Sequence, residues 1–146
     1  MGQKSREPIR ILDVASHQVT TVPGSEGKFG PKWSPDGQFI SAASTGATTL
    51  YIFDIKSQRW STLYEKSFFA FDTWSSDCRF IYLLRIEHDP SILRIPVVGG
   101  EPKTVAVDFP YTGTFGFWLG LDPTDAPLML RDVSTTDVYA LTLEEK

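Results

Sequence analysis

Trp33-Ser-Pro-Asp-Gly-Gln-Phe-Ile40 is followed by a near copy, Trp74-Ser-Ser-Asp-Cys-Arg-Phe-Ile81, which begins 41 residues later (74 − 33). In the first copy Pro35 is at the second position of a four-residue turn and Gly37 at the fourth. Proline fixes the backbone angle that a type I turn needs at its second position, and glycine is favoured at the fourth. The stretch therefore predicts a chain reversal between two β-strands, with the tryptophan at the end of the first strand.

Two further observations show that the repeat extends over most of the chain. A degenerate third copy, Leu121-Asp-Pro-Thr-Asp-Ala-Pro-Leu128, replaces the tryptophan with Leu121 and the glycine with Asp125. A second marker, at residues 13–22, 54–63 and 96–105, aligns without gaps at offsets of 41 (54 − 13) and 42 (96 − 54). Two markers in one phase predict a repeating unit of about 42 residues.

Each repeat is predicted to hold four short strands, because it is rich in β-branched and aromatic residues and has no ten-residue stretch of helical period. Two repeats are complete, at 28–63 and 69–107, while 8–22 is a half and 114–143 lacks its fourth strand. The predicted strands are 8–14, 18–22, 28–33, 38–44, 49–55, 59–63, 69–74, 79–86, 91–97, 103–107, 114–121, 127–132 and 137–143.

Four antiparallel strands in a repeat of 40 to 45 residues are typical of a β-propeller blade, so the fold class is predicted to be all-β. The stretch 33–40, with Leu50-Tyr-Ile-Phe-Asp-Ile55 after it, resembles the WD-like propeller repeat of the TolB family and of dipeptidyl-peptidase and prolyl-oligopeptidase type enzymes. The resemblance covers residues 8–143. It implies a non-catalytic module that binds a protein or peptide, the C-terminal part of a larger multidomain protein of bacterial type.

Composition sets the limits on other functions. The 146 residues and 16.3 kDa fit one domain, and the formal net charge of −4 has the wrong sign for a phosphate-backbone binder. The single cysteine, Cys78, makes no internal disulfide and, with only two histidines, supplies no zinc site of the common kind. No signal peptide or spanning helix is evident. We therefore expect no nucleic-acid or membrane partner, no metal and no cofactor.

The number of blades predicts an open ring. Propellers typically close with four to eight blades, whereas this chain holds two complete ones and two partial ones. A symmetric homodimer would have six blades if each partial blade were completed by the other copy. The strand at 137–143 would then be surplus, because it is equivalent to the strand at 8–14. The alternative is an open fragment of a longer propeller.

Catalytic signals are weak. No Gly-x-Ser-x-Gly nucleophile elbow occurs, and Gly99-Gly100 fits a hairpin turn better than a phosphate-binding loop. Glu87-His88-Asp89 is the one dense titratable cluster, and more often such a cluster is a solvated loop. No catalytic residue is predicted. The alternative function is a propeller enzyme or a small-ligand or metal-binding protein that uses the central channel of an assembled ring, with these three residues as candidates.

The aromatic residues on the first strand of each repeat are predicted to pack between blades, and Trp33→Ala is expected to cost about 3–5 kcal/mol. This set comprises Trp33, Trp74 and Trp118 with Phe29, Phe69, Phe71, Phe115 and Phe117. A partner is predicted to bind the face that holds the loops between blades and between second and third strands. The candidate binding residues there are Lys66, Glu87, His88, Tyr111 and Arg131, and the repeat motif itself comprises Trp33, Pro35, Asp36, Gly37, Trp74, Asp77 and Trp118.

Overall fold

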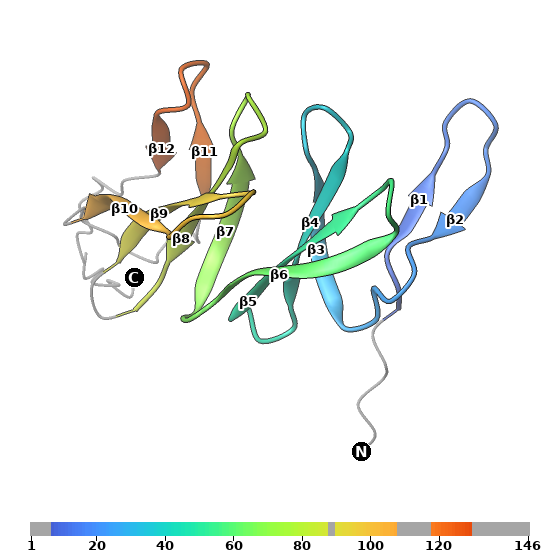
Figure 1. Ribbon diagram of the computed structural model, residues 1–146, viewed down its shortest axis with the longest axis horizontal. Helices are drawn as coiled ribbons and strands as arrows, with labels where there is room; N and C mark the ends of the chain where they lie inside the picture. The colour runs from blue at the N-terminus through green and yellow to red at the C-terminus, as the bar shows by residue number, and fades with distance from the viewer. Residues whose placement is uncertain (1–6, 88–89, 108–117, 130–146) are drawn as a thin grey trace, which may run out of the picture.

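The structure is a computed structural model that describes residues 7–87, 90–107 and 118–129. All twelve elements in these residues are β-strands, so the all-β prediction is confirmed for the described part of the chain. Two four-stranded antiparallel sheets lie side by side, with a two-stranded hairpin beyond each of them (Figure 1). No helix in the described ranges is long and apolar enough to span a membrane.

The two four-stranded sheets are blades in which every strand pairs with its neighbour in the chain. The first blade contains β3 (Lys28–Trp33), β4 (Phe39–Ser44), β5 (Thr49–Asp54) and β6 (Arg59–Glu65). The second blade contains β7 (Phe69–Trp74), β8 (Phe80–Arg85), β9 (Ser91–Pro96) and β10 (Lys103–Val107). All eight strands agree with the sequence prediction to within two residues.

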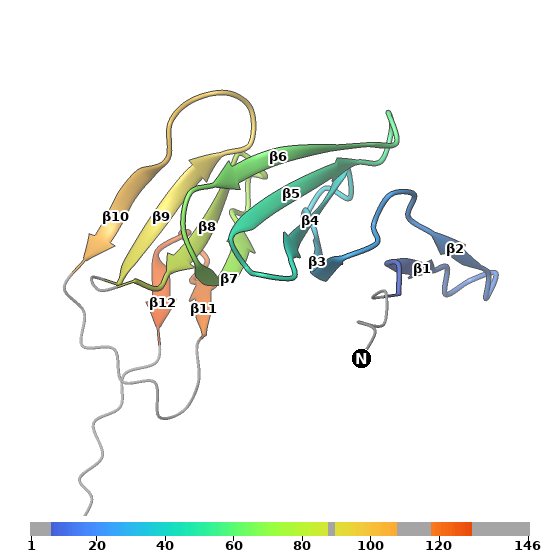
Figure 2. The ribbon, with the colours of Figure 1, turned by 90° about the horizontal axis from the view of Figure 1, so that it is seen from below.

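The N-terminal hairpin is shorter than predicted, and the C-terminal hairpin is described only in part. The N-terminal hairpin consists of β1 (Arg10–Leu12) and β2 (Val19–Thr21), and the C-terminal hairpin of β11 (Leu119–Leu121) and β12 (Pro127–Met129). The strand predicted at 137–143 lies outside the described residues, as do parts of those predicted at 114–121 and 127–132. Figure 2 shows the N-terminal hairpin to the right of the first blade and the C-terminal hairpin below the second blade.

Strand pairing confirms the 41-residue offset at the level of single residues. Leu12 pairs with Val19 in the N-terminal hairpin, just as Phe53 pairs with Trp60 in the first blade. The turns between these strands also match, because His17 and Gln58, which are 41 residues apart, have φ values of 56° and 57°. The strands β1 and β2 are therefore equivalent to β5 and β6, the third and fourth strands of a blade.

The third copy of the turn motif is one residue shorter than the gapless alignment predicted. Trp33 pairs with Ile40 and Trp74 with Ile81, whereas Leu121 pairs with Pro127 rather than with Leu128. Asp122 makes the shorter turn possible, because its Oδ1 accepts hydrogen bonds from the backbone N–H groups of Thr124 (2.7 Å) and Ala126 (2.9 Å). Ala126 is therefore equivalent to Phe39, and Pro127 to Ile40. Each lies one position later in the repeat than the gapless alignment predicted.

Apolar side chains pack between successive sheets in three clusters. The central cluster joins the two blades and contains Ala43, Leu50, Ile52, Tyr64, Phe69, Trp74, Ile81, Leu83, Leu93 and Ile95. The N-terminal hairpin packs on the first blade through Ile9, Val22, Ile40, Ala42 and Phe53. The C-terminal hairpin packs on the second blade through Tyr82, Leu84, Ile92 and Leu119. The core thus consists of layers between sheets.

The prediction that all the first-strand aromatics pack between blades is wrong for several of them. Trp74 and Phe69 are buried, with 8% and 1% exposed, but Trp33 is 49% exposed and Trp118 is 42% exposed. Phe29 is 41% exposed. Trp74 packs against β4, the second strand of the preceding sheet. The strand that would cover Trp33 in the same way lies 41 positions before Phe39–Ser44, so it would end at residue 3, outside the described residues.

Candidate interaction site

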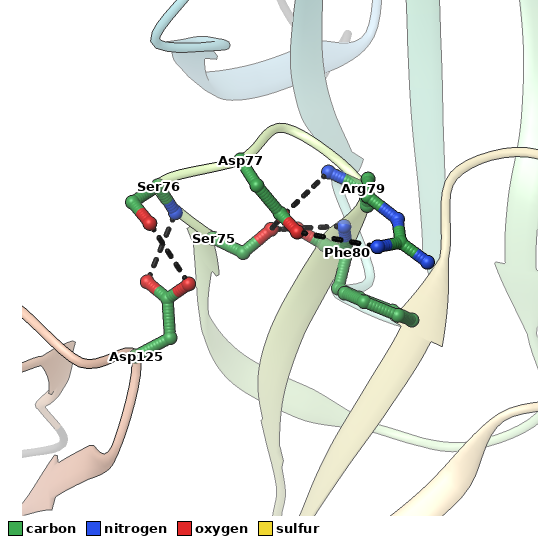
Figure 3. A network of polar contacts seen from close by, with 6 residues as sticks. All are labelled: Ser75, Ser76, Asp77, Arg79, Phe80 and Asp125. Carbon is green, nitrogen blue, oxygen red and sulfur yellow. Dashed lines mark hydrogen bonds and ion pairs between the residues drawn. The ribbon is translucent and has the colours of Figure 1, made fainter.

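The repeat motif forms the same turn in both blades. The Asp36 carboxylate accepts a hydrogen bond from Ser34 Oγ (2.6 Å) and one from the N–H of Gln38 (3.0 Å). Asp77 accepts the equivalent bonds from Ser75 Oγ (2.7 Å) and the N–H of Arg79 (3.0 Å), as Figure 3 shows. These hydrogen bonds lower the pKa of both carboxyl groups. The motif is therefore a turn-forming device.

Cys78 occupies the glycine position of the second turn. Its φ of 59° is close to the 70° of Gly37, so an L-residue here adopts a left-handed backbone. Burial raises the pKa of the Cys78 thiol, which agrees with a structural role. Asp125, the equivalent residue of the third turn, also has a positive φ (62°), and its carboxylate accepts bonds from the N–H (2.9 Å) and Oγ (3.0 Å) of Ser76 (Figure 3).

A polar pocket of about 280 Å³ lies where the end of the first blade meets the second. Tyr64 and the link after β6 line one wall, and β8, β9 and β10 supply the other. The lining residues are Tyr64, Lys66, Ser67, Arg85, Glu87, Leu93, Pro102 and Thr104. We call this the polar pocket; it contains both charge signs and several hydroxyl groups.

The charges in the polar pocket are only loosely paired. Lys66 Nζ lies 3.5 Å from Glu101 Oε2, between two side chains that are 67% and 87% exposed, so this pair is weak. Arg85 Nε lies 4.0 Å from Glu87 Oε2, which is beyond hydrogen-bond distance. Arg85 Nε is nevertheless a buried atom, and it has no hydrogen-bond partner among the described residues. The pocket wall thus contains a desolvated donor.

A second desolvated group lies beside Arg85. Ser91 pairs with Arg85 across β8 and β9 and is fully buried, and no residue in the described ranges hydrogen-bonds its Oγ. A buried polar atom without a partner costs about 1–3 kcal/mol, and such atoms are rare in native structures. Among the described residues, Arg85 Nε and Ser91 Oγ are thus the buried side-chain nitrogen and oxygen atoms that have no hydrogen-bond partner.

The predicted binding residues are partly brought together. Lys66 and Glu87, which come from different blades, line the same pocket. His88, Tyr111 and Arg131 lie outside the described residues, as does Asp89. Sequence reasoning missed Tyr64, which directly follows the strand predicted at 59–63, and Arg85, which is the penultimate residue of the strand predicted at 79–86. Within the described ranges, no three His, Cys, Asp or Glu side chains lie close enough to hold a metal ion.

A second polar cluster joins the inner strands of the two blades, and it is well satisfied. Asp72 is 6% exposed; it pairs with Lys32 Nζ (3.2 Å) and accepts a hydrogen bond from Ser41 Oγ (2.8 Å). Trp74 Nε1 donates to the same Ser41 Oγ at 3.2 Å. Because the buried polar atoms of Ser41, Asp72 and Trp74 are all hydrogen-bonded, this cluster stabilises the contact between the blades.

Two apolar grooves repeat from blade to blade. A groove of about 350 Å³ in the second blade is lined by Phe80, Cys78 and Val97, and one of about 280 Å³ in the first blade by the equivalent Phe39, Gly37 and Ile55. Each groove lies between the turn before the second strand of a blade and the turn after its third strand. Because the grooves recur at equivalent positions, they are a consequence of how a blade is built. The polar pocket is the stronger candidate site.

Comparison with known proteins gives little further guidance. No protein-family model matches the sequence, and no curated protein matches it. Among solved structures the chain is similar to a putative 6-phosphogluconolactonase from Bacteroides uniformis, with 13% sequence identity and a TM-score of 0.48. The match covers 77% of this chain and 35% of that one, so the chain spans about a third of the structure that it resembles.

Proposed function

We propose that this chain is a non-catalytic β-propeller module that binds a protein or peptide segment at the polar pocket. The resemblance of the repeat motif to propellers of the TolB and dipeptidyl-peptidase type supports this proposal, since such propellers serve as sensor or interaction domains. On the same ground the module is proposed to be part of a larger multidomain protein. The observation that carries the proposal is the polar pocket, in which two predicted binding residues, Lys66 and Glu87, meet.

The size of the polar pocket suits the side chains of a peptide. Pockets for drug-sized ligands usually have volumes of about 300–1,000 Å³, and the polar pocket, with about 280 Å³, lies at the lower end of that range. A volume of this kind accommodates one or two side chains, while the rest of a bound segment would lie along the neighbouring loops. This is the way in which a peptide or a protein loop binds.

The charges favour an acidic side chain in the segment that binds. Arg85 carries a buried donor that lacks a hydrogen bond among the described residues, and the exposed Lys66 lines the same pocket. A carboxylate is the group that best satisfies a guanidinium, because its two oxygens match the fork of N–H donors. Glu87 would attract a basic residue next to that carboxylate. The proposed ligand is therefore a segment with neighbouring acidic and basic residues.

Selection of peptides from a random displayed library on the full chain tests the proposal. Peptides enriched on the wild-type protein should share an Asp or Glu, and Arg85→Gln should weaken their binding at least tenfold. Arg59→Gln is the matched control, since Arg59 is an exposed arginine on β6, outside the pocket lining. Peptides that bind equally well to wild type and Arg85→Gln would contradict the proposed site.

A further inference from the structure

The two end hairpins are complementary halves of one blade. In the first blade the third strand, β5, lies between β4 and β6. The strand β1 is equivalent to β5, and among the described residues it pairs only with β2. At the other end, β11 and β12 are equivalent to β7 and β8, the first and second strands of a blade. Among the described residues, one hairpin thus supplies the two strands that the other lacks.

We propose that a second copy of this chain completes the blade, with β12 of one copy pairing antiparallel to β1 of the other. The register follows from the first blade, where Ile40 pairs with Phe53 and Ser41 with Ile52. The equivalent pairs across the joint are Leu12 with the partner's Pro127 and Ile11 with the partner's Leu128. This proposal is independent of the polar pocket, which lies within one chain.

Two such joints close a ring. Each chain contributes twelve described strands, so two copies have 24, which is six blades of four strands. Six blades lie within the range of four to eight at which propellers close. The contact joins the N-terminal end of one copy to the C-terminal end of the other, and such a head-to-tail contact forms a ring when its rotation closes.

The joint also covers Trp33. In the contact between the two blades, Phe39 stacks on Trp74 with ring centroids 6.3 Å apart, and Ser41 accepts the Trp74 N–H bond. The residues equivalent to Phe39 and Ser41 in the joint are the partner's Ala126 and the partner's Leu128. Trp33 is 49% exposed and Leu128 is 45% exposed, so two exposed apolar residues would cover each other.

The chemistry of the joint is matched on both sides. In the contact between the blades, Ser41 hydrogen-bonds Asp72, and both are polar and buried. The equivalent residues across the joint are the partner's Leu128 and Pro31, which are both apolar. A polar residue on one side alone would be buried without a partner. The ladder loses one bond, because Pro127 has no N–H, and it does so at the first residue of the strand, where proline is tolerated.

Two other segments could fill these places. The strand predicted at 137–143 could pair with β12 of its own chain, and residues preceding this sequence in a longer protein could pair with β1. A strand at 137–143 would leave Trp33 uncovered, and a preceding segment would leave the outer edge of β12 uncovered, whereas a second copy satisfies β1, β12 and Trp33 together. The second copy therefore accounts for more of the described structure.

Disulfide trapping tests the register. In a Cys78→Ser background, Ile11→Cys and Leu128→Cys are made in separate chains, which are mixed and mildly oxidised. Their sites form a non-hydrogen-bonded pair in the proposed ladder, where Cα atoms about 4.5 Å apart suit a disulfide. A covalent dimer should form in the mixture. Val19→Cys mixed with Leu128→Cys is the control, since Val19 is 59% exposed and lies on β2, one strand away.

Mass in solution tests the ring. Light scattering across a range of concentrations should give twice 16.3 kDa, and Trp33→Ala should weaken the dimer at least tenfold. A mass of 16.3 kDa at every concentration, a mass that keeps growing with concentration, or no more cross-linked dimer from the Ile11→Cys mixture than from the Val19→Cys control would each overturn the proposal.

Discussion

Trp33 and Trp74 hold the same position in successive blades, and yet they differ sixfold in exposure, at 49% and 8%. The turns that follow them are alike: in each, a serine hydroxyl donates to an aspartate that also accepts a hydrogen bond from a backbone N–H. Their surroundings differ, because Trp74 packs on Phe39 and Ser41 of the preceding sheet. The motif therefore determines the turn, while burial of its tryptophan depends on the second strand of a neighbouring blade.

The largest expected effect is the difference between alanine substitutions of the two tryptophans. Trp74→Ala removes a buried ring and should lower the free energy of unfolding by about 3–5 kcal/mol. Trp33→Ala removes a half-exposed ring and should cost about 1 kcal/mol or less when measured on the monomer. The figure that the motif alone suggested for Trp33 is thus too large. Urea unfolding at low protein concentration measures both values, and equal costs would contradict the difference in burial.

The polar cluster beside Trp74 gives the next largest effect. Asp72→Ala removes the nearer acceptor of the buried Ser41 hydroxyl, at 2.8 Å, and the ion pair of Lys32, so a loss of about 1–3 kcal/mol is expected. Pro31→Ala, at the equivalent position of β3, is the matched control and should change stability little, because Pro31 is exposed. Thermal unfolding of both variants makes the comparison. A loss for Asp72→Ala no larger than for Pro31→Ala would show that the cluster contributes no net stability.

The strands were predictable because they depend on local signals. Alternating apolar residues and turn formers at a constant period specified all eight strands of the two blades to within two residues. The third turn was misaligned because Asp122 alone accepts the bonds that a serine and an aspartate share in the other turns. Comparison with Trp33-Ser-Pro-Asp-Gly does not reveal this replacement of two acceptors by one, because the residue types differ although the hydrogen bonds of the turn are equivalent.

The site was less predictable than the strands. Lys66 and Glu87 were identified as charged loop residues, and the structure adds that they line one pocket. The role proposed for Arg85 depends on a buried Nε in a pocket that residues of both blades line, and no local pattern encodes that arrangement. Charged residues at loops can thus be found in a sequence, but which of them share a pocket depends on contacts between repeats.

A smaller effect is expected at the glycine position of the two turns. Cys78 has a φ of 59°, and a left-handed backbone costs an L-residue about 1–2 kcal/mol. Cys78→Gly should therefore raise the free energy of unfolding by about 1 kcal/mol, after the entropy lost on ordering a glycine. Gly37→Ala, with a φ of 70° in the first turn, should lower it by about as much. Chemical unfolding of the pair would show opposite signs, and a destabilised Cys78→Gly would mean that the thiol makes a contact worth more than the strain.

The smallest expected effect is a dependence of folding stability on pH. Both turns should show it, although their tryptophans differ in burial. Hydrogen bonds from Ser34 to Asp36 and from Ser75 to Asp77 lower both pKa values below the ordinary 3.8. A carboxyl group with a lowered pKa in the folded state stabilises the protein above pH 3.8, and this contribution is lost as the pH falls through the folded-state pKa.

Asp36→Asn and Asp77→Asn should therefore each lower Tm at pH 7, by a similar small amount, and the difference in Tm from wild type should narrow below about pH 4. Melting curves between pH 7 and pH 2 measure this gap. A gap that stays constant with pH would assign the role of the two aspartates to turn geometry and not to their charge. A larger gap for Asp77→Asn would be due to Arg79, which lies 3.9 Å from the Asp77 carboxylate and further lowers its pKa.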